Sequence, residues 1–136
     1  MNKLILLILL FVILGCSKNE ESKEIGADIF LTDLKAASSV YELKENLPEW
    51  LAVRIDDYYE TRTPSFCKVM IYRGEWNKQT IYFILDTYSA CLCDFYTEDG
   101  ERIVDNLSDL RVTSKNWVLI YEYGDFVLNL DELFSN

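Results

Sequence analysis

The chain contains no histidine in its 136 residues. This absence excludes Ser-His-Asp and Cys-His catalysis, histidine-ligated zinc and pH switching through an imidazole. Basic residues are few as well, because 13 Lys and Arg stand against 23 Asp and Glu, for a formal net charge of -10. An acidic surface repels phosphate groups, so we expect no nucleic-acid partner.

Residues that break regular structure are also scarce. There are two prolines and five glycines, whereas half of the residues are hydrophobic. A chain of this length and composition can bury one hydrophobic core and is too apolar to be disordered.

The N-terminus has the layout of a targeting segment. Lys3 is the only charge in residues 1–15, and an unbroken apolar run extends from Leu4 to Leu14. A helix needs about 20 apolar residues to span a bilayer, so this shorter run is typical of a secretory signal peptide. Its end, Ile13-Leu14-Gly15-Cys16, resembles the lipobox of bacterial lipoproteins. The resemblance implies that residues 1–15 are cleaved as a signal peptide and that Cys16 receives a covalent lipid, which anchors the chain to the membrane. We expect no other cofactor.

A polar tract follows the lipobox. Residues 17–24 include no apolar side chain, so residues 16–26 are expected to form the lipidated cysteine and a flexible tether. Ser17 in the second position is similar to lipoproteins that pass to the outer membrane. The stretch from Lys18 to Glu21 looks like the surface-export signal of one group of Gram-negative envelope lipoproteins, and a charged linker fits its composition equally well. We expect an outer-membrane lipoprotein of the bacterial cell envelope, with surface exposure left open.

Residues 27–136 are expected to form one α+β domain. Apolar residues at spacings of three and four predict an amphipathic helix from Pro48 to about Glu60, which Pro64 ends. These residues are Leu47, Trp50, Leu51, Ile55, Tyr58 and Tyr59. Before this helix, Ser38 or Ser39 is expected to cap a short helix, and residues 25–34 fit an extended lead-in or a first strand.

After Pro64 the apolar residues alternate, which is typical of strands. The expected strands are Cys67 to Arg73, Thr80 to Asp86, Cys91 to Thr97, Arg102 to Val104, Asn116 to Tyr123 and Phe126 to Leu130. Asp99-Gly100 predicts a tight turn, and short connections favour antiparallel pairing of neighbours. The expected α+β fold is an amphipathic helix packed on a curved antiparallel sheet of about four to six strands.

Five short segments follow one another over about residues 47–104. They are Leu47-Pro48-Glu49-Trp50-Leu51, Val69-Met70-Ile71-Tyr72, Ile81-Tyr82-Phe83, Cys91-Leu92-Cys93-Asp94 and Phe95 to Ile103. This succession resembles a family of small uncharacterised bacterial envelope lipoproteins, which pair a proline-led helix with a Tyr-rich sheet, a cysteine cluster and an Asp-Gly hairpin. The resemblance implies the fold and the place in the cell, and it brings no known activity with it. Leu92 separates two cysteines that are expected to be adjacent in that family.

Lipidation of Cys16 would leave Cys67, Cys91 and Cys93 as thiols. In an oxidising envelope we expect one disulfide and one leftover thiol among these three residues. A simple meander would place one strand between Cys67 and the other two cysteines, at least about 9 Å away, which is too far for a disulfide. Disulfide exchange by Cys91 and Cys93 is an alternative, although redox motifs place two residues between their cysteines.

Trp76 is the first candidate for contact with a partner. It is expected in the loop from Gly74 to Lys78, where burial is difficult, and exposed Trp anchors protein and carbohydrate contacts well. The adjacent acids Asp56 and Asp57 point to different sides of a helix, so they cannot act together on one substrate bond as a hydrolytic pair. We also expect no metal site.

The chain is therefore expected to be a lipid-anchored envelope protein with a binding or structural role and no enzymatic activity. Its partners, besides the membrane, would be an envelope protein or a glycan. A small thiol/disulfide redox protein and an inhibitor or immunity-type partner of a secreted enzyme are the alternatives.

Overall fold

A computed structural model describes residues 28–88 and 93–133 of the chain, in which six strands form one sheet. The strands are β1 (Ser38–Ser39), β2 (Val69–Trp76), β3 (Gln79–Asp86), β4 (Cys93–Thr97), β5 (Arg102–Ile103) and β6 (Lys115–Tyr123). Their order across the sheet is β1-β6-β2-β3-β4-β5, and only the β1–β6 pair is parallel. The α+β fold with a mostly antiparallel sheet is thereby confirmed.

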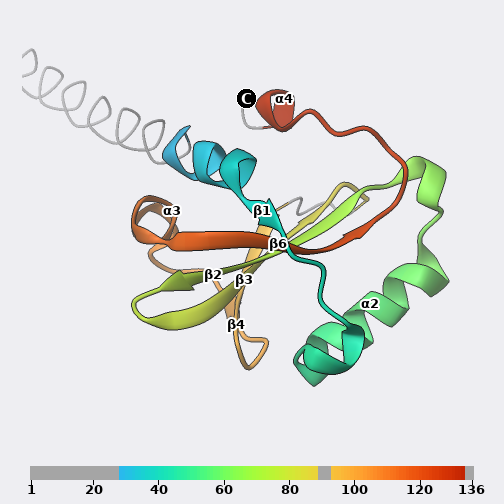
Figure 1. The fold of residues 1–136 in the computed structure, drawn as a ribbon, viewed down its shortest axis with the longest axis horizontal. Helices are drawn as coiled ribbons and strands as arrows, with labels where there is room; N and C mark the ends of the chain where they lie inside the picture. Colours follow the sequence, from blue (N-terminus) through green and yellow to red (C-terminus); the bar gives the residue numbers. More distant parts are fainter. Residues whose placement is uncertain (1–27, 89–92, 134–136) are drawn as a thin grey trace, which may run out of the picture.

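Helices lie on both faces of this sheet (Figure 1). The helical elements are residues 28–36, the 3-10 turns η1 (Lys44–Asn46) and η2 (Pro64–Phe66), and the helices α2 (Glu49–Thr61), α3 (Leu107–Thr113) and α4 (Leu130–Leu133). Alternation along the strands divides the buried residues between two cores. On one face α2 packs Leu51 and Ile55 against the sheet, and on the other Phe30, Leu34 and Leu110 cover a cluster of aromatic residues.

Helix α2 confirms the spacing argument. The carbonyl of Pro48 accepts the first hydrogen bonds of the helix, from the N–H groups of Leu51 and Ala52 at 2.9 and 3.0 Å. The helix ends at Thr61, and Arg62 is extended because Pro64 follows closely. The side chains of Leu51, Ile55 and Tyr58 are buried.

Two expectations for the N-terminal part of the domain are wrong. Residues 28–36 form a helix rather than a strand, because Phe30 and Leu34 are one turn apart and fill one apolar site together. Ser38 and Ser39 form strand β1 instead of capping a helix, and the pairing continues where the Val40 N–H donates to the Leu119 carbonyl at 2.8 Å. The open edge of β6 supplies these hydrogen bonds.

The C-terminal part also differs from the expectation. Phe126 to Leu130 is not a strand, and the side chain of Val127 is 90% exposed. Strand β6 lies beside β2 instead of β5, because α3 carries the chain across the face that holds Phe30. Leu110 of α3 is fully buried there, so the helix is part of the core rather than a loose connection.

Candidate functional site

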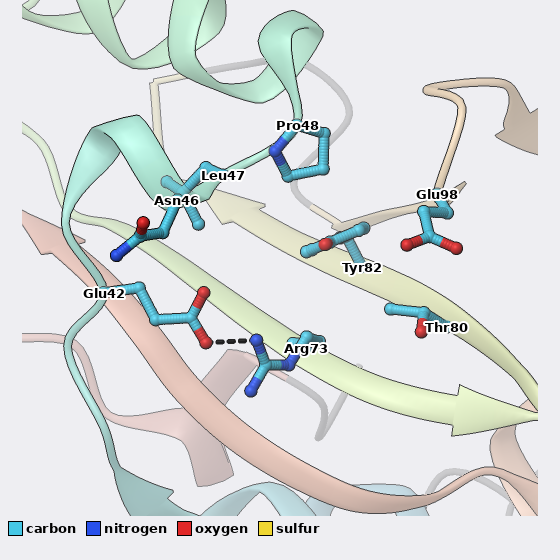
Figure 2. Close-up of a pocket in the computed structure, with 8 residues that line it drawn as sticks. All are labelled: Glu42, Asn46, Leu47, Pro48, Arg73, Thr80, Tyr82 and Glu98. Atoms are coloured by element: carbon cyan, nitrogen blue, oxygen red, sulfur yellow. Dashed lines mark hydrogen bonds and ion pairs between the residues drawn. The ribbon is translucent and has the colours of Figure 1, made fainter.

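A hollow of about 560 Å³ opens on the α2 face of the sheet, beside the first turn of α2. It is lined by Glu42, Asn46, Leu47, Pro48, Arg73, Thr80, Tyr82 and Glu98 (Figure 2). Strands β2 and β3 form the floor, the segment between β1 and α2 forms one wall, and the turn between β4 and β5 contributes Glu98 to the other. Three segments that are distant in sequence therefore meet around one opening.

The floor of the hollow combines a cation with a buried phenol. Arg73 of β2 and Tyr82 of β3 lie directly opposite each other, and Arg73 Nη1 forms an ion pair with Glu42. Tyr82 is only 4% exposed, and its hydroxyl makes no hydrogen bond to any residue that the structure describes. Burial raises the pKa of Tyr82, Arg73 opposes this rise, and Glu98 and Glu42 add to it. The phenol thus lies within the field of all three charged side chains of the hollow.

The wall that carries Glu98 is fixed by Trp50. The indole Nε1 of Trp50 donates to the Glu98 carbonyl at 2.9 Å, and the ring contacts Tyr82 edge-on at a centroid distance of 5.7 Å. Gly100 turns the chain with φ +86°, and a Cβ at this residue would lie 2.7 Å from the indole. Only glycine fits both the positive φ and this close approach. The β4–β5 turn is therefore held at a defined distance from α2.

The polar groups of the hollow suit binding. Besides the Arg73–Glu42 pair, the side chains of Asn46, Thr80 and Glu98 make no hydrogen bond with the described part of the chain. Hydroxyl, amide and carboxylate groups with free hydrogen-bonding capacity can take up a polar ligand, since each one offers an acceptor. Among residues 28–88 and 93–133 no group of three acidic or cysteine side chains is placed to hold a metal ion.

A smaller hollow of about 270 Å³ adjoins the first one between α2 and β6. It shares Glu42 and Leu47 with the larger hollow, and Tyr59, Ile55 and Tyr121 complete its apolar side. Lys44 and Asp56 also line it and form an ion pair at 2.6 Å. Asp56, one of the adjacent acids considered from the sequence, therefore has a structural partner on the surface.

Of the cysteines predicted from the sequence, the structure describes Cys67 and Cys93, and it does not bring these two together. Cys67 is a free, fully buried thiol just before β2, and burial raises its pKa. Cys93 opens β4, and β3 lies between β2 and β4. Strands β2 and β4 are therefore two strand spacings of about 4.8 Å apart. At this distance the backbones of Cys67 and Cys93 are too far apart for a disulfide. Cys91 and the lipidation residue Cys16 lie outside the described residues, so a disulfide between Cys91 and Cys93 stays a prediction.

Trp76 differs from its expected environment. It is the last residue of β2 rather than part of a loop, because Asn77 and Lys78 alone form the turn, with φ of 51° and 63°. The indole packs against the core that holds Phe30 and donates from Nε1 to Asp109 Oδ2 of α3 at 3.1 Å. The Trp76 side chain is half-buried, and its role as a partner contact stays a prediction.

Sequence reasoning missed the hollow. One signal was present, since Arg73 interrupts an apolar strand and a charge at such a position needs a partner. That partner, Glu42, precedes it by 31 residues in a segment without a recognisable motif.

Comparisons give no further guide to this site. None of the helices in the described ranges is long and apolar enough to span a bilayer. No protein-family model, no curated protein and no solved structure matches the chain.

Proposed function

We propose that this protein is a lipid-anchored, non-enzymatic binding module of the bacterial cell envelope, held in the outer membrane through Cys16. The observation that carries the anchor is the lipobox-like ending Ile13-Leu14-Gly15-Cys16 of the apolar run, followed at once by polar residues 17–24. Several acyl chains on one residue hold a protein to a bilayer stably, whereas one chain alone does not.

The hollow beside α2 supports the binding role. It brings a buried phenol, an ion pair and a further carboxylate to one opening of about 560 Å³, a size within the range of small-ligand pockets. Paired strands of the sheet hold Arg73 and Tyr82, and Trp50 holds the turn that carries Glu98. A site with rigid walls loses little conformational entropy when a ligand binds.

The anchor is tested with the substitution Cys16→Ala in the full chain, with Ser22→Ala in the polar tract as the control. The natural chain and the control should sediment with the outer membrane and incorporate a radiolabelled fatty acid. Cys16→Ala should lose the label and leave the membrane fraction. Unchanged fractionation of Cys16→Ala would overturn the proposed anchor.

Surface display is tested separately by protease treatment of intact cells. Digestion of the domain would place it on the outer face of the outer membrane. Protection would place it on the periplasmic face, and both results are compatible with an outer-membrane anchor.

A further inference from the structure

The hollow beside α2 has an excess of negative charge. Arg73 is neutralised by Glu42, which leaves the carboxylate of Glu98 without an ion-pair partner in the described chain. Both carboxylates approach the floor from separate segments (Figure 2). An anionic ligand entering here would meet two carboxylates and a guanidinium that is already engaged, so the local field favours a cation.

A second observation concerns a free hydrogen-bonding group in the same place. The Tyr82 side chain is 4% exposed, yet its hydroxyl has no hydrogen-bond partner among the described residues. The ring is packed into the sheet while the hydroxyl lines the hollow, so the phenol oxygen is free to accept a hydrogen bond from a ligand there. The influence of Arg73, Glu42 and Glu98 on the pKa of Tyr82 agrees with a hydroxyl that faces all three.

We propose that this hollow binds an organic cation, an ammonium or guanidinium group carried on an alkyl chain. The proposal rests on the binding role above and names its ligand class. Ammonium and guanidinium groups only donate hydrogen bonds, and Glu98 and Tyr82 both offer free acceptors. Leu47 and Pro48 line the hollow beside them and provide apolar contact for the alkyl chain.

Two sources carry this chemistry, a basic side chain of a partner protein and a free polyamine. The overall charge of the chain, -10, attracts either one. A capped lysine or arginine represents the first source, and putrescine represents the second. Tighter binding of the capped residues would indicate a protein partner.

The experiment is a titration of the ¹⁵N-labelled full chain in neutral detergent, followed by two-dimensional NMR. The probes are N-acetyl-lysine methylamide, N-acetyl-arginine methylamide and putrescine. Norleucine and glutamate, capped in the same way, and methyl glucoside serve as neutral, anionic and sugar comparisons. The cationic probes should shift the amide signals of Thr80, Tyr82 and Glu98, and binding should weaken as salt is added.

Paired variants locate the binding. Tyr82→Phe and Glu98→Gln should each weaken binding of the cationic probes about tenfold, because the first removes the acceptor of a charged hydrogen bond and the second removes the negative charge that faces the cation. Tyr72→Phe removes a buried hydroxyl from the opposite face of the sheet, and Glu101→Gln removes an acid from the same β4–β5 turn. These two control variants should bind as the natural chain does.

Several outcomes would overturn the proposal. These are equal binding of the norleucine and lysine probes, shifts confined to residues outside the hollow, and unchanged affinity in Glu98→Gln. If Tyr82→Phe fails to fold, Glu98→Gln decides alone, since Glu98 lies on an exposed turn. Binding of the sugar or the anionic probe at the hollow would overturn the ligand class and leave the binding role intact. Whether Cys16→Ala leaves the membrane fraction tests only the anchor and does not affect the proposed ligand class.

Discussion

Gly74 lies in the middle of β2, where a methyl group has no room. A Cβ built on Gly74 would lie 2.6 Å from Cδ2 and Cε3 of Trp117 and 2.8 Å from Cζ3. The indole cannot simply turn away, because it is 5% exposed, packs edge-on against Phe30 at 5.6 Å and donates from Nε1 to Ser114 Oγ at 3.2 Å. Gly74→Ala should therefore strain the core on the side of Phe30.

The expected cost follows from two opposing effects. Overpacking of a well-packed core costs about 1–3 kcal/mol, and contacts below 3 Å to a buried ring place Gly74→Ala in the upper half of that range. Alanine also restricts the unfolded chain more than glycine does, which stabilises the folded state by about 0.4–1 kcal/mol. The free energy of unfolding should fall by about 2 kcal/mol, and the midpoint of thermal unfolding by roughly 8 °C.

Urea unfolding followed by far-ultraviolet circular dichroism measures this cost, with Trp117→Phe as the second background. Phenylalanine lacks the fused ring that meets the added methyl group, so Gly74→Ala should cost less than about 1 kcal/mol there. A stability unchanged within about 0.5 kcal/mol in the natural background, or the same cost in both backgrounds, would refute the packing argument.

Two further predictions concern titratable side chains away from the hollow. Burial and the raised pKa of Cys67 should keep this thiol unreactive toward iodoacetamide in the folded chain, and denaturant should make it fully reactive. Rapid alkylation of Cys67 in the folded chain, detected by mass spectrometry, would contradict its burial. The hydrogen bond from Lys68 lowers the pKa of Glu122 below its usual 4.5, so the charged carboxylate stabilises the folded chain at neutral pH, and this contribution is lost as pH falls through the lowered pKa. Glu122→Gln should be less stable than the natural chain at neutral pH and equal to it in acid, and urea unfolding that shows a pH-independent difference would contradict this linkage.

Local patterns predicted the elements whose packing depends on nearby residues. The three- and four-residue spacing around Leu51 and Ile55 predicted α2, because that helix buries one face against the sheet. The helix of residues 28–36 is not predicted by its pattern, because only Phe30 and Leu34 are buried in the core there and their partners lie far along the chain. A pattern that short does not separate a helix from a strand.

The hollow could not be predicted for a related reason. Glu42 reaches Arg73 only because the chain after β1 continues beside β6, and Glu98 reaches its place only because Trp50 holds the β4–β5 turn. Neither the contact of Glu42 with Arg73 nor the position of Glu98 leaves a periodic signal in the sequence. Trp76 shows the converse case, since its place next to a turn predicts exposure, whereas Asp109 of α3 accepts a hydrogen bond from its indole.

The parallel pairing of β1 with β6 fixes an order of events in folding. Ser38 and Ser39 pair with residues of the last strand, and Lys35 forms an ion pair with Asp131 beyond that strand. Strands β2 to β5 can pair with neighbours in sequence as soon as they are made, whereas Ser38 and Ser39 have no strand to pair with until β6 is in place. Contacts between such distant residues form slowly because a long loop must close first. We therefore expect β1 to be synthesised early and to join the sheet only after β6, so that its segment stays without a strand partner while the chain is unfinished.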